Sequence, residues 1–583
     1  GFAWLTLPSG REVSIVDVPG HERFIKNMLA GVGAIDLALL IVAADESVMP
    51  QTREHLAILD LLQIRRGLVV VTKTDLADDV MVELVKAEIE DALEGTTFQG
   101  AQMVGVSAYS GDGLDELKDA IDAILDETQA RADLGRPRLP VDRCFSITGF
   151  GTVVTGTLID GGFAVGQEVE LVSSGQKARI RGLQSHQSHI DQTQPGVRLA
   201  VNISGISRDE VPRGEVLTTA GWLHPTYRLD ARLRMVKGIG HSLRHNQGVS
   251  FHLFTSESNA RVRLLDADRL APGTEGWVQI LLNEPLPAVK GDFFIIRSAE
   301  DTLGGGQVVD PAPRRRHRRF SPEVVERMMM LDQGTGEDVL FTVAEQREPC
   351  ELADLSQHSN LPVPEVLERI AVLESQGHVA VLGKLGVDSD AVVFSTQGWN
   401  VLKSKLDMSL QAYHNQYPLR RGAPVQEIRS RLGLSLPVYQ RVVARLALEA
   451  LLVEDGTYLR TPDHQVSLTP EMEKQASDFV AALEREPYSP PTDHPVDREL
   501  LSILADQGKV VKITDSIVFA APAFQEMRDR IIEHIRAQGD QGSITVAETR
   551  TMFNTSRKYV LPLLEYLDQQ QITRRVGDER VLR

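Results

Sequence analysis

The chain has 583 residues and a formal net charge of −19 at pH 7, and its length allows roughly four domains of ordinary size. This excess of acidic residues argues against a surface that binds nucleic acid everywhere, so any RNA contact must be local. No run of about eighteen apolar residues occurs, which predicts no membrane contact. Cys144 and Cys350 lie far apart and lack metal-site spacing, which is typical of a cytoplasmic protein.

The first 129 residues alternate strand-like runs with helix-period segments, a pattern typical of a doubly wound α/β domain. One apolar run, taken as a parallel strand, ends in Asp17 and is followed by Pro19, Gly20 and His21. A carboxylate and then a glycine amide at a strand end suit a nucleotide switch. We predict that Asp17 holds Mg²⁺ through water, Gly20 senses the γ-phosphate and His21 orients the attacking water. The DxxG motif alone is weak, because such turns are common.

Two further motifs follow apolar runs in the same region. The predicted guanine site consists of Thr72, Lys73, Asp75, Ser107 and Ala108. The Asp75 carboxylate could accept both N–H groups of the guanine edge, the Lys73 stem could cover the base, and a backbone N–H at Ser107 or Ala108 could meet O6. Between the motifs, the near-continuous apolar run 36–45 predicts a strand buried on both faces. Three motifs at successive strand ends predict a GTP-binding domain at 1–129.

The composition changes after a charged, proline-containing linker. Short β-branched runs divided by glycines predict two small antiparallel β-barrels, at 134–222 and 223–313, with glycines allowing close strand crossing. His186 and His189 share a polar hairpin loop without a third ligand, so no metal site is predicted there. The basic run Arg314–Arg319 follows, and its pattern fits a contact with an RNA backbone and a solvated linker equally well.

Beyond residue 320 one pattern occurs four times. An amphipathic helix runs into a short apolar hairpin at intervals of roughly 60–75 residues, which is the size of a winged-helix module. The predicted modules are 320–396, 397–462, 463–521 and 522–583.

The last module combines an apolar helix stripe with basic residues. The stripe, which must face the core, consists of Val560, Leu563, Leu564 and Leu567. Arg557 and Lys558 start the same helix and point elsewhere, while Arg574 and Arg575 lie in the wing, and Arg580 and Arg583 add to the basic character of this end. We predict that the first four of these basic residues bind RNA, because RNA readers place such side chains on phosphates beside splayed loops. Docking to a protein fits the first three modules better.

Several stretches together resemble one family, the bacterial selenocysteine-specific elongation factors (SelB), which are relatives of elongation factor Tu. They are DVPGHERF with NMLAGVG, QTREHLAIL, TKTD, GFGTVVTGT, and SRKYVLPLLEYLD with ITRRVGDERVLR. The resemblance spans nearly the whole chain, although between residues 321 and 522 it lies in pattern more than in letters. Thr72 stands where many GTPases have Asn.

The resemblance implies a multidomain fold: a partial α/β P-loop GTPase domain, two antiparallel β-barrels and four tandem winged-helix modules. It implies a GTPase that uses GTP and Mg²⁺ and delivers selenocysteyl-tRNA to the ribosome at recoded UGA codons, as a cytoplasmic monomer tethered to an mRNA hairpin. No GxxxxGK[ST] phosphate loop occurs in the 583 residues. We therefore expect an N-terminally truncated chain, lacking the phosphate loop and first switch, that binds GTP weakly and does not hydrolyse it.

The resemblance also implies a pocket for the aminoacyl group in the first barrel. Asp142 and Arg143 match an Asp-Arg pair of the family, and Arg213 matches the arginine of an RG turn. Selenocysteine is a selenolate at neutral pH, so two guanidinium groups could bind it and reject the neutral hydroxyl of serine. The alternative is that Asp142 and Arg143 pair with each other.

Two competing interpretations remain. A general translational GTPase of the Tu or initiation type predicts no use for four winged helices and no preference for selenocysteyl-tRNA. A non-enzymatic winged-helix RNA-binding protein would use the GTPase remnant as a scaffold, but Asp17, Asp75 and Ser107 would then have no reason to occur together.

Overall fold

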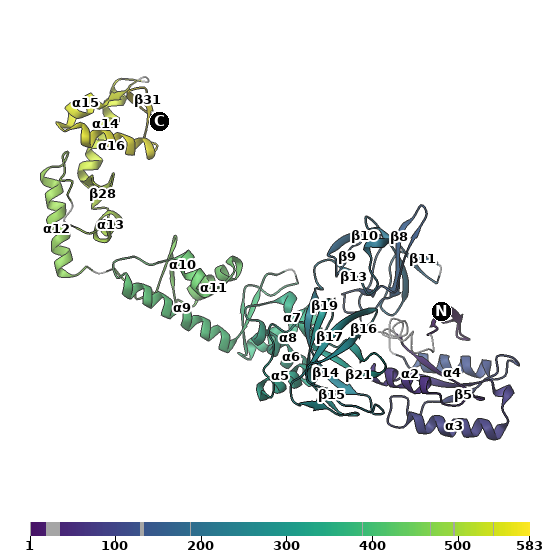
Figure 1. Cartoon of the computed structure of the whole chain (residues 1–583). Helices are drawn as coiled ribbons and strands as arrows, with labels where there is room; N and C mark the ends of the chain where they lie inside the picture. The colour runs from purple at the N-terminus through teal and green to yellow at the C-terminus, as the bar shows by residue number, and fades with distance from the viewer. Residues whose placement is uncertain are drawn as a thin grey trace. The chain divides into compact units, whose positions relative to one another are not determined.

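The computed structural model describes residues 2–18, 35–128, 133–186, 188–387, 389–466, 468–493, 496–539 and 542–583. The chain forms two compact units, Gly1–Gly398 and Trp399–Arg583 (Figure 1). No helix within the described ranges is long and apolar enough to cross a membrane.

The first unit begins with an α/β domain. Its parallel sheet has the order β3 (Ala38–Ala43), β4 (Gly67–Thr72) and β5 (Met103–Gly105). The helices are α2 (Pro50–Leu61), α3 (Asp79–Leu93) and α4 (Leu114–Asp126). Side chains alternate along a strand, so Val69 and Val71 pack against α2 and α3, whereas Leu68 and Val70 pack toward α4. Helices on both faces confirm the doubly wound arrangement.

One strand prediction in this domain was wrong, and another is not matched within the described residues. β2 (Glu12–Val16), which precedes Asp17, pairs antiparallel with β1 (Phe2–Thr6). Among the described strands, no parallel partner of β2 is found. β3 lies at the end of the order β3-β4-β5, and Ile41 on it is 53% exposed. An apolar run by itself does not distinguish a central strand from an edge strand, because both can have the same β-branched composition.

The second domain is an all-antiparallel sheet, ordered β6-β13-β9-β10-β12-β8-β7, with β11 paired to β10. Its strands are β6 (Arg138–Pro140), β7 (Arg143–Ile147), β8 (Gly151–Thr157), β9 (Glu168–Leu171), β10 (Gln176–Ser185), β11 (Ser188–Ile190), β12 (Arg198–Ile203) and β13 (Val216–Thr219). A Cβ at Gly156 would collide with the Pro140 carbonyl oxygen. The predicted close strand crossing in GFGTVVTGT is therefore present at this glycine.

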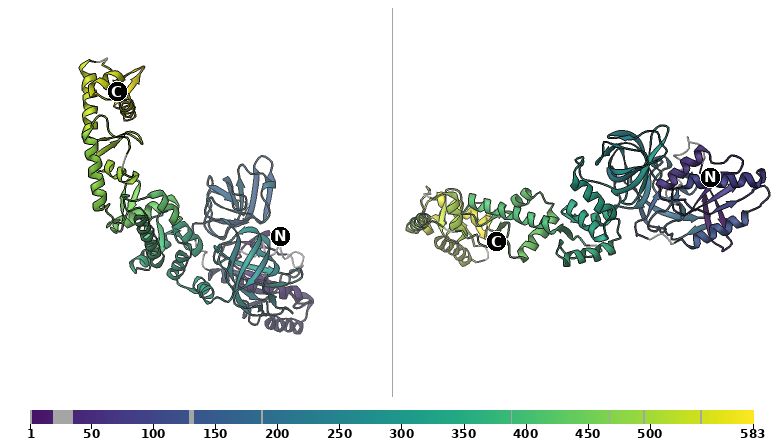
Figure 2. Two further views of the ribbon diagram at one scale, coloured as in Figure 1. Left: turned by 60° about the vertical axis from the view of Figure 1, so that its left-hand side comes forward. Right: turned by 90° about the horizontal axis from the view of Figure 1, so that it is seen from below.

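The third domain is a closed barrel ordered β14-β19-β17-β16-β20-β21, seen as curled strands in teal in Figure 2. Its strands are β14 (Pro225–Met235), β16 (Gln247–Leu253), β17 (Ser256–Leu264), β19 (Glu275–Pro287), β20 (Phe293–Arg297) and β21 (Thr302–Asp310), with a side ribbon of β15 (Leu243–Arg244) and β18 (Arg269–Leu270). Phe251 and Phe294 stack in its core with centroids 5.1 Å apart. A Cβ at Gly304 or Gly306 would collide with β14 backbone, so glycines let β21 close the barrel.

The basic run Arg314–Arg319 lies along this barrel. His317 Nε2 is 2.5 Å from the Asp230 carboxylate inside the barrel wall, and Arg319 donates to the Leu264 carbonyl at 2.9 Å. Burial raises the pKa of the Asp230 carboxyl, and the His317 hydrogen bond opposes that shift. The run is thus not simply a solvated linker, because two of its side chains fasten it to the barrel.

The four winged-helix modules follow in the predicted order. The first contains α5 (Pro322–Gln333), α6 (Gly336–Arg347), α7 (Leu352–Ser359), α8 (Val363–Ser375), β22 (Cys350–Glu351), β23 (Val379–Leu382) and β24 (Val392–Ser395). The second contains α9 (Thr396–Gln416), α10 (Val425–Leu432), α11 (Leu436–Leu448), β25 (Ala423–Pro424), β26 (Val453–Asp455) and β27 (Tyr458–Arg460). Each pairs its three strands into a small antiparallel sheet, as a winged helix should.

The last two modules share a core. The third contains α12 (Pro470–Arg485), α13 (Arg498–Asp506), β28 (Val510–Lys512) and β29 (Val518–Ala520). The fourth contains α14 (Ala521–Ala537), α15 (Val546–Phe553), α16 (Arg557–Gln569), β30 (Ile544–Thr545), β31 (Thr573–Val576) and β32 (Glu579–Leu582). Ile517 and Phe519 of the third module pack in one cluster with the predicted α16 stripe, which is fully buried. The predicted boundary between the third and fourth modules, after residue 521, therefore divides this shared core.

Candidate nucleotide and RNA sites

The predicted guanine residues meet where β4 and β5 end. Parallel strands present their carboxyl ends at one sheet edge, so the turns after β4 and β5 are neighbours. The Ser107 hydroxyl donates to Asp75 Oδ1 at 2.6 Å. Ser107 is buried and Asp75 is exposed, so the bond fixes a carboxylate that solvent, or a base, can reach. This arrangement fits an acceptor for the guanine N1–H and amino group.

The neighbouring groups refine this site. Lys73 adopts a left-handed backbone with φ 58°, and its Nζ lies 3.0 Å from Asp45 and 3.3 Å from Glu46. These carboxylates raise the pKa of Lys73 and tether its stem beside Asp75. The Ser107 amide donates to the Asp112 carbonyl at 3.0 Å, which leaves the Ala108 amide as the candidate for the O6 contact. Asp45 and Glu46 were not predicted as part of the site, although both lie within three residues of the end of β3.

Only some of the residues predicted to contact Mg²⁺ and the phosphates lie within the described ranges. Asp17 is exposed just beyond β2, whereas Pro19, Gly20 and His21 lie outside the described residues. Within the described ranges, no group of three or more His, Cys, Asp or Glu side chains is arranged to hold a metal. His186 instead places Nε2 at 2.8 Å from the Ser14 hydroxyl, where the second domain touches the β1–β2 hairpin.

The three predicted selenocysteine-pocket residues all lie in the second domain. The Val141 amide donates to the Glu215 carbonyl at 2.8 Å, so Arg143 and Arg213 each lie two residues from one hydrogen bond. Both arginines have exposed side chains. This backbone pairing thus joins the two segments that carry Arg143 and Arg213, which are about seventy residues apart in the sequence.

Asp142 has partners that the sequence did not reveal. Its carboxylate lies 2.7 Å from Arg198 Nη1 and accepts from the Thr155 hydroxyl at 2.7 Å. Arg198 and Asp142 are mostly buried, with side chains 17% and 11% exposed. Asp142 is therefore neutralised from the β12 side by Arg198, a residue that neither the pocket prediction nor the Asp142–Arg143 pairing included. Arg198 begins the RLAVNIS run, but only the strand register places it beside Asp142.

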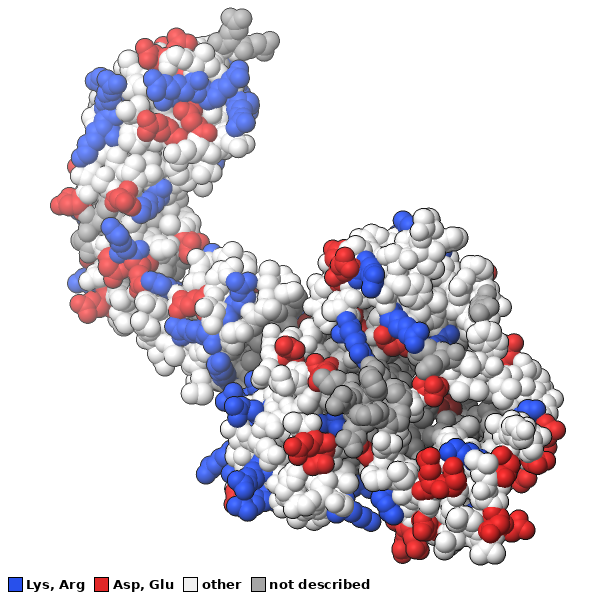
Figure 3. All heavy atoms as spheres, turned by 45° about the vertical axis from the view of Figure 1, so that its right-hand side comes forward, with Lys and Arg blue, Asp and Glu red and all other residues white. Residues whose placement is uncertain are grey.

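The predicted RNA-binding residues are exposed at one end of the chain. Arg557, Lys558, Arg574 and Arg575 all face solvent, and Figure 3 shows blue side chains gathered on the C-terminal modules. Residues 522–583 hold ten basic and nine acidic residues, whereas residues 1–129 hold nine basic and 23 acidic residues. Positive charge is thus available locally in an acidic chain, as RNA binding by one module requires.

Arg580 does not belong to this basic surface. It is 2% exposed, and its Nε lies 3.4 Å from Asp568, which also accepts from the Thr573 hydroxyl. The sequence places Arg580 among the basic residues of the wing, but the fold uses it inside the module.

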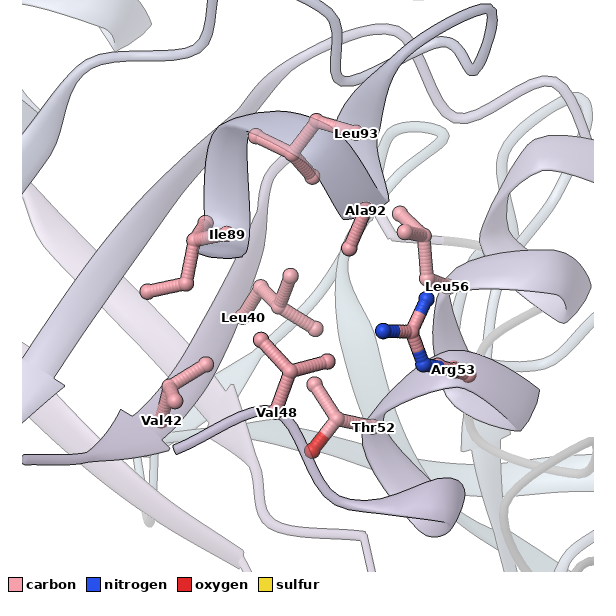
Figure 4. A pocket seen from close by; sticks show the side chains of 9 residues that line it. All are labelled: Leu40, Val42, Val48, Thr52, Arg53, Leu56, Ile89, Ala92 and Leu93. Carbon is pink, nitrogen blue, oxygen red and sulfur yellow. The ribbon is translucent and has the colours of Figure 1, made fainter. Parts of the chain in front are cut away.

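One small cavity lies within the α/β domain, between β3, α2 and α3 (Figure 4). It is lined mostly by apolar side chains and measures about 10 Å³. A volume of this size holds about one water molecule at most, so it is a packing gap and offers no room for a nucleotide.

Family models match along most of the chain. They are the Elongation factor Tu GTP binding domain at residues 6–127, Elongation factor Tu domain 2 at 151–218, the Selenocysteine-specific elongation factor beta-barrel domain at 230–315, and Elongation factor SelB winged helices at 408–460 and 536–582.

Relatives match over the full length. A protein of Desulfomicrobium baculatum named selenocysteine-specific elongation factor is 36% identical, covering 100% of this chain and 93% of that protein. The protein of the same name from Escherichia coli is 30% identical, covering 100% and 92%. The crystal structure of a bacterial selenocysteine-specific elongation factor EF-Sec has the same fold, with a TM-score of 0.70 at 22% identity, covering 100% of this chain and 92% of that one. The chain belongs to the family of selenocysteine-specific elongation factors.

Proposed function

We propose that this chain delivers selenocysteyl-tRNA to the ribosome in a GTP-dependent way at recoded UGA codons, as a monomer, while its last winged-helix module holds an mRNA hairpin. The observation that carries the proposal is the winged-helix array with a locally basic end, attached to a translation-factor body. A factor of the Tu or initiation type has no use for that array. Tethering by the message raises the local concentration of the tRNA complex at one codon.

The nucleotide would bind at the β4 and β5 ends. Asp75, held by Ser107, accepts from guanine, Ala108 donates to O6, and the Lys73 stem covers the base. Mg²⁺, when bound, neutralises charge on the β- and γ-phosphates. Asp17 would hold it through water, Gly20 would donate to the γ-phosphate, and His21 would orient the water that attacks.

Ion pairs support communication between the nucleotide domain and the third-domain barrel. Arg234 of β14 lies 2.8 Å from Asp60 of α2, and Arg297 of β20 lies 3.4 Å from Glu54 of the same helix. Two bonds from one helix to one barrel couple a shift of α2 to the position of the barrel. This gives the nucleotide state a route to the tRNA-holding domains.

The aminoacyl group would bind beside Arg143 and Arg213. Two cations would stabilise a selenolate more strongly than the neutral hydroxyl of serine, because only the anion gains charge–charge attraction from them. Arg198 supports this role, because it neutralises Asp142, which would otherwise repel the selenolate. Paired in this way, Asp142 would have a structural role in the pocket and would not itself contact the selenolate.

The 583-residue chain is expected to bind GTP weakly and not to hydrolyse it, because these residues contain no GxxxxGK[ST] cradle. GTP should bind no more than about 10–100-fold more tightly than guanosine, because Gly20 offers the γ-phosphate one hydrogen bond, worth about 1.5–3 kcal/mol, and no lysine cradle adds to it. Equilibrium titration with fluorescent analogues measures this. Asp75→Ala should abolish the residual binding and Asp115→Ala should not. GTP binding much tighter than guanosine binding would contradict the expectation.

The tethering proposal is tested with the full chain and a panel of labelled RNA hairpins across a salt series. We expect preference for one hairpin loop. Replacing Arg557, Arg574 and Arg575 together by Ala should weaken binding about 10–100-fold and flatten the salt dependence by roughly one unit of slope for each lost phosphate contact. The matched control replaces three exposed basic residues outside the fourth module: Lys405, Lys474 and Arg485. Equal, weak binding to every RNA and to duplex DNA would refute tethering.

A further inference from the structure

A short segment of the third module is built into the fourth. Residues Tyr488–Thr492, here called the YSPPT segment, lie between α12 and α13. The Tyr488 ring packs 5.2 Å from that of Phe553 at the end of α15, within the hydrophobic cluster of the fourth module. The Tyr488 hydroxyl donates to Glu526 of α14 at 2.7 Å. The segment therefore moves with the fourth module.

Hydroxyl groups join the YSPPT segment to the start of α16. Thr555, two residues before the helix, donates to the Tyr488 carbonyl at 2.6 Å. The Ser489 hydroxyl lies 2.8 Å from that of Thr555, and it must donate, because the Thr555 hydrogen is already used. Two consecutive prolines follow Ser489 and restrict the backbone that leads to Thr492.

The segment also touches one of the predicted RNA-binding residues. Lys558 Nζ donates to the Thr492 hydroxyl at 3.1 Å and lies 5.4 Å from the Tyr559 ring centroid. An ammonium group carries three donors, so this bond fixes the amine and leaves hydrogens for a second partner. Because the Thr492 oxygen accepts from Lys558, its own hydrogen also points away from Lys558.

We propose that the YSPPT segment forms a second wall of the RNA-binding surface, with Thr492 as the residue that positions Lys558 on a hairpin phosphate. The proposal rests on the RNA tethering proposed above. Fixing a long, flexible lysine before binding lowers the entropy lost when it meets a phosphate. The Thr492 hydroxyl and the Lys558 ammonium are neighbouring donors, and phosphate oxygens can accept from both. An apolar ligand would leave both donors without an acceptor.

The test uses the full 583-residue chain and the labelled hairpin that the wild-type chain prefers. Thr492→Val keeps the shape and removes the hydroxyl, and it should weaken binding about 3–10-fold. Thr492→Ser should restore the affinity. In a Lys558→Ala background, Thr492→Val should cause no further loss, because the two residues act as one unit. Thr551→Val, an exposed threonine on α15 of the same module, is the matched control and should bind like wild type.

The salt dependence separates positioning from simple stabilisation of the module. Thr492→Val should lower the salt slope about as much as Lys558→Ala does, and thermal unfolding of the variant should match wild type. Full affinity in Thr492→Val, or an equal loss with and without Lys558, would overturn the inference while leaving tethering intact. A wild-type chain with no hairpin preference would overturn tethering and this inference with it.

Discussion

Replacing both Arg143 and Arg213 by Gln is expected to make the chain bind selenocysteyl-tRNA and seryl-tRNA with nearly equal affinity. Each hydrogen bond from a guanidinium group to an anion contributes about 1.5–3 kcal/mol. Two such bonds correspond to a preference of roughly 10²–10⁴-fold in affinity for selenocysteyl-tRNA over seryl-tRNA. The double variant should lose this preference. The affinity for selenocysteyl-tRNA should fall and that for seryl-tRNA should not, because only the anionic selenolate gains charge–charge attraction from the two cations.

The measurement is competition between the two aminoacyl-tRNAs on one preparation. A ratio of affinities cancels the guanine-nucleotide occupancy, which is the same for both ligands. Arg179→Gln is the matched control, because this exposed arginine lies on β10 of the same sheet, and it should leave the ratio unchanged. Equal affinities in the wild-type chain, or an unchanged ratio in the double variant, would exclude the arginine pocket.

Asp292→Ala is expected to lower the free energy of unfolding by about 3–5 kcal/mol. Arg138 of the second domain holds Asp292 of the third with two bonds, of 2.8 and 2.9 Å, and also holds Asp160 at 2.8 Å. Arg138 and Asp292 are each about 5% exposed. Removing one carboxylate leaves a buried guanidinium at the junction of the two domains with half of its neutralising charge.

Urea unfolding followed by tryptophan fluorescence measures the effect. Trp222 serves as a reporter, because it packs beside Val289 of the third domain and donates to Thr218 of the second. The double variant with Arg138→Met should recover part of the loss, since the apolar replacement removes the buried guanidinium and leaves without this partner only Asp160, whose side chain is 17% exposed. Asp115→Ala removes an exposed pair with Lys118 and should not change the stability measurably. A similarly small effect of Asp292→Ala would contradict the argument.

Part of the site could be read from the sequence because its signals are local. The guanine motifs occupy consecutive residues, and Asp75 and Ser107 meet because parallel strands end at one edge. The α16 stripe needed only helical periodicity. The position of β3 at the end of the described sheet order could not be read, because strand order depends on partners far away in the chain.

The sequence by itself determined the order of domains, the guanine motifs and the basic end of the last module, since each is a pattern within a few residues. Only the tertiary structure decided which charges work together. It paired Asp142 with Arg198, buried Arg580 against Asp568, and set Thr492 beside Lys558. The physical reason is that an ion pair or hydrogen bond needs atoms within about 3 Å. Strand register and module packing set such distances, and no local periodicity encodes them.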